Sequence, residues 1–150
     1  MGSETDLPKM EKAAEVLKQF AVPYEMKVIS AHRLPDRVAE YANGAEKRGL
    51  QVLIAGAGMA NHLAGTLAAR TTLPVIGVPL SGSALAGVDA LYSTVQMPKG
   101  VPVATVAVDV AANAAYLAVE ILALGDAQLQ RKLKQYRQAE RKRLEASLSK

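Results

Sequence analysis

The sequence predicts one α/β domain built on a parallel sheet, and three observations support this. Helical and strand patterns alternate along the chain with short loops, which favours strand–helix–strand crossovers. Half of the 150 residues are hydrophobic, mostly Ala, Val, Leu and Ile, with no Trp and one Phe. Such small side chains let helices pack closely on a sheet. We therefore expect residues 1–150 to form a single domain with one core.

Each expected element has its own signal. Met10, Ala13 and Leu17 recur at helical spacing, which predicts a first helix over 7–20 with Asp6 as its N-cap. Gly49 is expected to stop the second helix. The predicted strands are 24–30, 51–55, 74–78 and 103–108, and the further helices are 35–48, 58–70, part of 84–94, 111–124 and 126–148.

Composition excludes several classes of protein. The chain has no cysteine, so disulfides, Cys-ligated zinc and iron–sulfur clusters are excluded. No segment reaches the roughly 18 apolar residues of a membrane helix, and the N-terminus lacks the pattern of a signal peptide. We expect a cytoplasmic protein that does not bind a membrane.

The excess of Lys and Arg over acidic residues lies mostly in one stretch near the C-terminal end. The formal net charge is +4, and the Lys and Arg residues concentrate between 131 and 143. This run could contact nucleic acid or an anionic membrane. A solvated helix is the favoured interpretation, with Leu129, Leu133 and Tyr136 on one stripe and segment 126–150 packed on a neighbouring subunit. We therefore predict no nucleic-acid partner.

Ligands of doubly wound sheets bind beyond the carboxyl ends of the strands, and two polar segments are expected there. Ser3 and Asp6 precede the first helix, where hydroxyls and amides can hold a phosphate or ribose; an ordinary N-cap or an expression scar is the alternative. Ser30, His32 and Arg33 follow a predicted strand and offer a base and a phosphate clamp. A capped turn with a solvated His–Arg pair is the alternative for this second segment.

A glycine loop follows the next predicted strand. Gly56 and Gly58 would let a ligand approach the backbone closely, but their spacing does not fit a dinucleotide fingerprint. His62, in the same segment, is equally consistent with a functional or a structural histidine. Loops 79–83 and 93–102 could line a pocket or a subunit contact, but their sequences do not indicate a particular function.

Together these segments resemble the class I 5-(carboxyamino)imidazole ribonucleotide mutase family, the catalytic subunit of bacterial phosphoribosylaminoimidazole carboxylase. The resemblance runs from residue 1 to about residue 140, in the family's order and spacing. The strings that carry it are MGSETD, VISAHRLPDRV, IAGAGMANHLAG, LPVIGVP, GVDALYSTVQMPKGVPVATVAV and NAAYLAVEILAL.

The resemblance implies a three-layer flavodoxin-like sandwich, a homo-octamer and an active site between subunits without metal or cofactor. It implies that His32 is the general acid and base, while Ser30 and Arg33 hold the nucleotide substrate. Ser3 and Asp6 would bind its ribose and phosphate end. The carboxylate or carbon dioxide would lie in a pocket shaped by the remaining residues: Gly58, Met59, Ala60, His62 and Leu63. Transfer of the substrate from the upstream carboxyaminoimidazole synthetase is a further implication.

The residues suit the implied chemistry. Loss of carbon dioxide from a labile carbamate leaves an aminoimidazole with a nucleophilic ring carbon, and the two fragments recombine at that carbon while held together. One imidazole can protonate the departing nitrogen and later remove the proton from carbon. Backbone amides of the glycine loop can stabilise the carboxylate.

The sequence departs from the family pattern at several points. Thr5, Leu34, Met59, Asn61 and Val110 replace residues that are more common there. The largest departure is that the first strand, central in the family's sheet, is apparently missing. We expect truncation or a late start codon, which would expose hydrophobic surface.

Two alternatives to the mutase remain. Class II relatives carboxylate aminoimidazole ribonucleotide directly with carbon dioxide, although the glycine loop is more similar to class I. A catalytically impaired assembly scaffold is the non-enzymatic alternative.

Overall fold

The computed structural model describes residues 1–148, whose core is a three-stranded parallel sheet in the order β1-β2-β3. Strand β1 (Leu53–Gly58) pairs with β2 (Val75–Leu80) along their whole length, and β2 pairs with the short β3 (Ala104–Thr105). Every residue of β2 is buried, which explains its uninterrupted apolar sequence VIGVPL. The predicted parallel sheet is confirmed.

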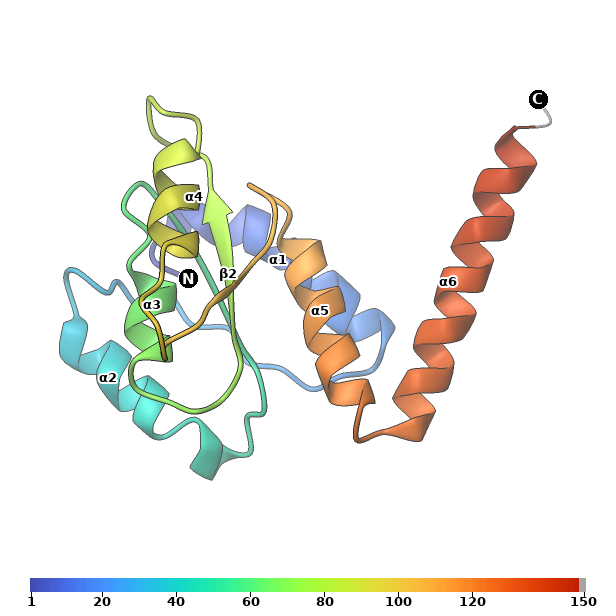
Figure 1. Cartoon of the computed structure of the whole chain (residues 1–150), viewed down its shortest axis with the longest axis horizontal. Helices are drawn as coiled ribbons and strands as arrows, with labels where there is room; N and C mark the ends of the chain where they lie inside the picture. The colour runs from blue at the N-terminus through green and yellow to red at the C-terminus, as the bar shows by residue number, and fades with distance from the viewer. Residues whose placement is uncertain (149–150) are drawn as a thin grey trace.

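Helices cover both faces of this sheet and make three layers (Figure 1). Helices α1 (Leu7–Gln19) and α5 (Ala111–Ala123) pack together over one face, against Ile76, Val78 and Leu80. The opposite face carries α2 (Pro35–Asn43), α3 (Leu63–Ala68) and α4 (Val88–Val95). The long helix α6 (Ala127–Ser147) starts against α5 and projects from the body.

The helix ends agree with the prediction in part. Asp126 caps α6 through its Oδ1, which accepts from the amides of Gln128 and Leu129 at 2.8 and 3.0 Å. Gly49 adopts a left-handed conformation with φ 83° and ends the short 3-10 helix η2 (Glu46–Arg48), as predicted. The continuous helix predicted over 35–48 is wrong, because α2 ends at Asn43 and η2 is a separate turn.

Asp6 stands at the predicted N-cap position of α1, but it does not cap the helix with its side chain. A 3-10 turn, η1 (Glu4–Asp6), precedes α1, so Asp6 already has helical geometry and its side chain makes no capping bond. Ser3 caps η1, since its Oγ accepts from the Thr5 amide at 3.3 Å. The chain therefore enters the helical segment earlier than the sequence pattern indicated.

Two predicted strands are absent or shorter than expected within residues 1–148. Segment 24–30 is extended but is not a strand, because its backbone bonds to another segment are confined to Met1: the amino group donates to Lys27 O, and Ile29 N donates to Met1 O. The segment predicted over 103–108 is a strand only at Ala104 and Thr105, although Val106 N still donates to Gly77 O of β2 at 3.1 Å. The absence of a strand at 24–30 reflects a lack of partners, which local propensity does not report.

The helix predicted over 58–70 starts later, at Leu63, because β1 continues to Gly58 and residues 59–62 form a turn. Within residues 1–148, no helix combines the length and the hydropathy needed to span a membrane.

Candidate active site

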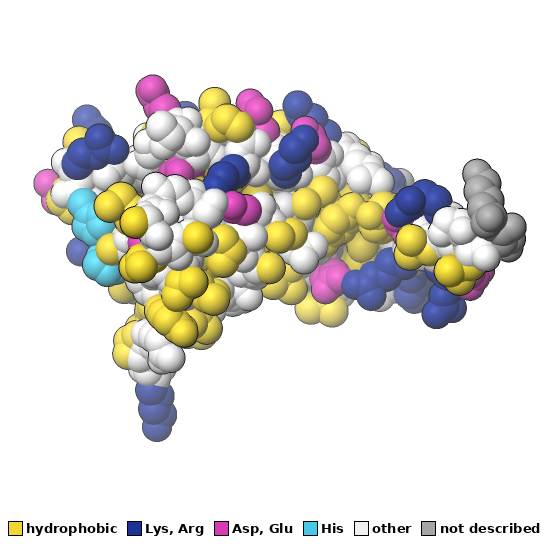
Figure 2. Space-filling model, turned by 90° about the horizontal axis from the view of Figure 1, so that it is seen from above, with side chains coloured by type: hydrophobic (Ala, Val, Ile, Leu, Met, Phe, Trp, Pro, Cys, Tyr) yellow, Lys and Arg dark blue, Asp and Glu magenta, His cyan; other side chains and the backbone are white. Residues whose placement is uncertain are grey.

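Two histidines meet at the edge of the sheet where the parallel strands end. His32 follows the extended segment 24–30, and His62 lies directly before α3. Their Nε2 and Nδ1 atoms are 2.8 Å apart, and the rings lie edge to face at 80°. Both side chains are exposed and form one patch (Figure 2). Because a hydrogen bond between two ring nitrogens needs one donor and one acceptor, at least one of the rings is neutral in this contact.

Ser30 organises the turn that presents His32. Its Oγ accepts from the backbone N and from the Nε of Arg33, each at 3.3 Å, and its carbonyl accepts from the Leu34 amide. These bonds tie the guanidinium to the turn through Nε. Within residues 1–148, the terminal guanidinium nitrogens of Arg33 have no hydrogen-bond partner. They are therefore available for the planar, two-point recognition of a phosphate.

The segment before α1 reaches the same edge through the backbone. The Gly2 amide donates to Gly56 O of β1 at 3.0 Å, which places Ser3 beside the end of that strand. Ser3 Oγ also accepts from Thr5 Oγ1 at 2.9 Å. Burial raises the pKa of the Asp6 carboxyl above its ordinary value, and the bond to the Ser3 backbone opposes this only in part. Asp6 is therefore a hydrogen-bond acceptor that is partly shielded from water.

A buried asparagine fixes the turn that carries His62. The Asn61 side chain is fully buried, and its Nδ2 donates to Thr94 Oγ1 at 2.9 Å and to Val78 O at 3.3 Å. Its backbone N donates to Ser93 Oγ at 2.8 Å. This anchor joins the turn to β2 and α4. The family resemblance in the sequence did not predict this role for Asn61.

The remaining predicted residues have different surroundings. Met59 and Ala60 are exposed, and Met59 has φ 54°, a left-handed conformation that is costly for a side chain of its size. Gly58 lies close to β2, since a Cβ there would be 3.1 Å from Leu80 O. Leu63 is buried in the core with α2, so only its backbone can face a ligand.

A polar cluster at this edge was missed by sequence reasoning. Lys9 Nζ donates to Ser81 O, Ser81 Oγ and Asp109 Oδ1, each at 2.7 Å. Asp109 also accepts from the Ser81 amide at 2.9 Å and from the Ser81 hydroxyl. The cluster joins α1 to the loops that follow β2 and β3. The three residues lie far apart in the sequence, and only Ser81 fell in a segment considered for function.

The Asp109 contacts predict a pH-dependent stability. Partial burial works to raise the pKa of Asp109, but hydrogen bonds from Lys9 and Ser81 outweigh it and hold the pKa below its ordinary value. An acid whose pKa is lower in the folded chain stabilises the fold at neutral pH, and this contribution is lost as the pH falls through the folded-state pKa. We expect Asp109→Asn to lower the free energy of unfolding by about 1 kcal/mol at pH 7 and by less in acid, since the pair is about a third exposed.

Asn is the suitable replacement because Asp109 has φ 62°, and Asn tolerates that conformation well. Urea denaturation across pH measures the effect, with Asp36→Asn on the exposed start of α2 as the control. An Asp109→Asn chain that matches the parent at neutral pH would contradict the assignment.

No group of three or more His, Cys, Asp or Glu residues in the part of the chain described is arranged to hold a metal ion.

Comparison with known proteins identifies the family. The model of the family described as AIR carboxylase matches residues 1–143, which is nearly the whole chain. The chain belongs to the AIR carboxylase family. Its resemblance to class I carboxyaminoimidazole ribonucleotide mutases is thereby confirmed.

Individual AIR carboxylase family members carry two kinds of name. N5-carboxyaminoimidazole ribonucleotide mutase of Pyrococcus abyssi is 60% identical over 138 residues, which cover 92% of this chain and 79% of that protein. Phosphoribosylaminoimidazole carboxylase of Ogataea methanolica is 60% identical over 126 residues, 84% of this chain but only 23% of that protein.

The AIR carboxylase fold is confirmed by a solved structure. The crystal structure of Treponema denticola PurE superposes with a TM-score of 0.88 at 30% sequence identity, covering 99% of this chain and 93% of that one. The predicted three-layer flavodoxin-like sandwich with a long C-terminal helix is therefore correct.

Proposed function

We propose that this chain is an isomerase of purine biosynthesis that converts 5-(carboxyamino)imidazole ribonucleotide to 4-carboxy-5-aminoimidazole ribonucleotide. The observation that carries the proposal is the 2.8 Å contact between His32 and His62 at the carboxyl edge of the sheet. It places two titratable rings beside the Ser30–Arg33 turn. The identity of 60% to a protein named as this mutase supports the same activity.

The proposed site holds the nucleotide by its phosphate and ribose. Arg33, tied to Ser30 through Nε, offers its terminal nitrogens to the phosphate. Ser3 and Asp6 accept or donate hydrogen bonds at the ribose and phosphate end. The exposed turn Gly58–Ala60, with His62 and the Leu63 backbone, holds the carboxylate or the carbon dioxide derived from it.

His32 transfers the proton in both half-reactions. The C–N bond of the carbamate breaks, its electron pair returns to the exocyclic nitrogen, and His32 supplies the proton that this nitrogen takes up. The ring carbon then attacks carbon dioxide and forms the new C–C bond. His32 removes the proton from that carbon, which restores the aromatic ring and returns His32 to its starting state.

Retention of carbon dioxide distinguishes a mutase from a carboxylase. Both fragments must stay in one site, so recombination is faster than escape. The Ser30 turn carries His32, and the Asn61 anchor holds the turn that carries His62. The exposure of both rings allows a nucleotide to reach them directly.

An isotope experiment tests the proposal. We expect substrate carrying ¹³C in its carbamate to give ¹³C-labelled product in unlabelled bicarbonate buffer, because the carbon dioxide is not released. Product formed from aminoimidazole ribonucleotide and bicarbonate alone should accumulate much more slowly. Complete loss of the label, with turnover that depends on bicarbonate, would instead establish the carboxylase activity for which the Ogataea protein is named.

Assembly into a homo-octamer in the cytoplasm completes the proposal, with substrate received from the upstream synthetase. The supporting observation is a group of exposed apolar side chains near the histidines and along α4, namely Met59, Leu85, Val88, Tyr92 and Val95. Apolar patches of this kind mark contacts between chains. The projecting half of α6 is proposed to pack on a neighbouring subunit.

A further inference from the structure

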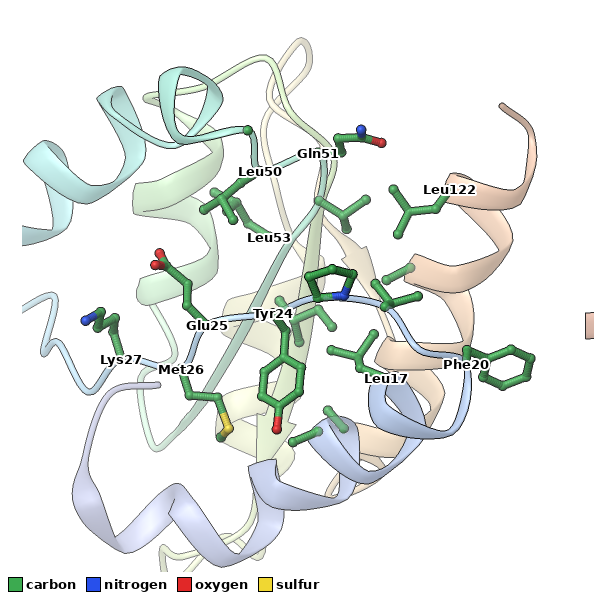
Figure 3. A pocket seen from close by; sticks show the side chains of 18 of the residues that line it. Leu17, Phe20, Tyr24, Glu25, Met26, Lys27, Leu50, Gln51, Leu53 and Leu122 are labelled. Atoms are coloured by element: carbon green, nitrogen blue, oxygen red, sulfur yellow. The ribbon is translucent and has the colours of Figure 1, made fainter. Parts of the chain in front are cut away.

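Both histidines of the chain stand in one contact at the surface. The sequence contains two His residues and no Cys, so every imidazole of the protein belongs to the pair His32 and His62. Figure 2 shows the two rings together on the outside of the molecule. The largest cavity among the described residues, about 1050 Å³, lies around Leu17, Tyr24 and Leu53 and is lined by neither ring (Figure 3). Solvent therefore reaches the pair directly, and a small ion needs no channel to reach it.

The distance between the two ring nitrogens suits a metal chelate. His32 Nε2 and His62 Nδ1 are 2.8 Å apart. Bonds of about 2.0–2.1 Å from one ion to two imidazoles, set at a right angle, place the two nitrogens about 2.9 Å apart. A tetrahedral angle with the same bonds places them about 3.3 Å apart. The observed separation therefore fits neighbouring corners of a square-planar or tetragonal ion, which is the geometry that Cu²⁺ and Ni²⁺ prefer.

The two rings are free to turn toward such an ion. Within residues 1–148 neither ring has a second hydrogen-bond partner, and both side chains are exposed. In the present contact one ring nitrogen donates to the other, whereas an ion set to one side of the contact needs a lone pair from each. A neutral donating ring therefore changes tautomer: its proton passes to water, and the other nitrogen of that ring takes up a proton. Both rings are then neutral, as metal-bound imidazoles must be.

The backbone on each side of the pair is fixed, which favours binding at two points. The Ser30 hydroxyl accepts from the Arg33 amide on one side, and on the other the buried Asn61 side chain donates to Thr94. The turns thus hold both imidazoles close together before an ion arrives. The second imidazole then binds as an intramolecular ligand at a high effective concentration. Two imidazoles that lie 30 positions apart in the sequence thereby act as one ligand.

The remaining coordination positions are open to water. In the part of the chain described, no third His, Cys, Asp or Glu joins the pair in a metal-binding group, so the site differs from the closed four-ligand centre of structural zinc. The Arg33 guanidinium in the same turn opposes a cation, but the turn is exposed and solvent weakens the repulsion. Selectivity then follows the ion's own affinity for imidazole, which rises from Ni²⁺ to Cu²⁺ and falls at Zn²⁺.

We propose that His32 and His62 form a two-imidazole chelate for a divalent late transition-metal ion, with water in its other positions. Cu²⁺ is the preferred ion, followed by Ni²⁺. One consequence rests on the isomerase function proposed above: the ion is an inhibitor and not a cofactor. It occupies His32 Nε2, and a nitrogen bonded to a metal cannot pass a proton between the exocyclic nitrogen and the ring carbon.

Isothermal titration calorimetry of the full 150-residue chain, without an affinity tag, tests the site. We expect saturable binding of one Cu²⁺ per chain, weaker binding of Ni²⁺, and no detectable binding of Mg²⁺, a hard ion that prefers oxygen ligands. Electron paramagnetic resonance of the Cu²⁺ complex should show hyperfine coupling to two imidazole nitrogens.

Single-histidine variants separate a chelate from binding by one ring. His32→Asn and His62→Asn each leave one imidazole, so each should weaken Cu²⁺ binding by about 100-fold or more, through loss of the intramolecular second ligand. Both side chains are exposed, so thermal melts should show that both variants fold like the parent. The double variant contains no histidine and gives the background of binding by the chain terminus and the carboxylates.

The proposal fails if the parent binds Cu²⁺ no better than the double variant, or if either single variant keeps the parent's affinity. Tighter binding of Zn²⁺ than of Cu²⁺ would overturn the right-angle geometry and the preference derived from it. Activity is read separately. If Cu²⁺ binds as expected but conversion of carboxyaminoimidazole ribonucleotide is unchanged with the ion bound, the metal site stands and the acid and base role of His32 is wrong. Calorimetry decides the metal site even for a parent chain without isomerase activity.

Discussion

We expect His32→Asn to lower kcat for the carboxyaminoimidazole conversion by about 10²–10⁴-fold, while KM changes by only a few-fold. Asn is polar and can still hydrogen-bond to His62, but it cannot carry the proton that the proposed mechanism moves from carbon to nitrogen. His32 is exposed, so its replacement should leave the melting temperature nearly unchanged. Steady-state kinetics with a thermal melt measures both quantities.

His62→Asn is the matched control, since the two rings touch and have similar exposure. If His62 orients His32 and shapes the carboxylate pocket, its loss should reduce kcat less than the loss of His32. A His32→Asn enzyme with the parent's kcat would exclude the acid and base role. A larger effect at His62 would exchange the two assignments.

We expect Gly77→Ala to destabilise the fold by about 1–3 kcal/mol, the cost of overpacking a filled core. Gly77 lies in the middle of β2, and a Cβ there would overlap the methyl group of Thr94 and approach Val103 at 3.0 Å. Thr94 cannot easily move, because its hydroxyl accepts from Asn61 and donates to Ala90 O. Urea denaturation measures the loss.

Gly56→Ala provides the comparison within the same sheet. A Cβ at Gly56 would meet the end of the Met10 side chain, a flexible thioether that can change rotamer. Its cost should therefore be clearly smaller than that of Gly77→Ala. Equal costs at the two glycines would show that the Asn61–Thr94 contact does not hold α4 rigidly against β2.

The sequence predicted the elements whose stability comes from one continuous pattern. The apolar run of β2 and the helical periodicity of α1 and α5 predicted these elements correctly, with small shifts of their ends. Segment 24–30 has a strand-like composition, but a strand also requires neighbours, and those lie far away in the chain. The bend at Gly44 likewise depends on packing that the α2 pattern does not contain.

The parts of the candidate site that lie within one short motif could be predicted from the sequence. Ser30 and Arg33 lie in one turn, so their contact follows from their spacing. The meeting of His32 with His62 joins segments separated by 30 positions, and it could be expected only from the rule that strand ends share one edge. Lys9 and Asp109 lie still farther apart, and neither stands in a recognisable motif.

The attachment of α6 divides that helix into two parts of unequal stability. Its first turns are held by the buried Leu129, by the stacked rings of Tyr116 and Tyr136, and by an ion pair between Arg137 and Glu120. Beyond these contacts the exposed turns have mainly the Glu140–Arg143 pair on their own surface. A helical stretch of such length is marginal in water without support. The outer turns should therefore fray and re-form in the isolated chain, and their amide protons should exchange long before those of α5.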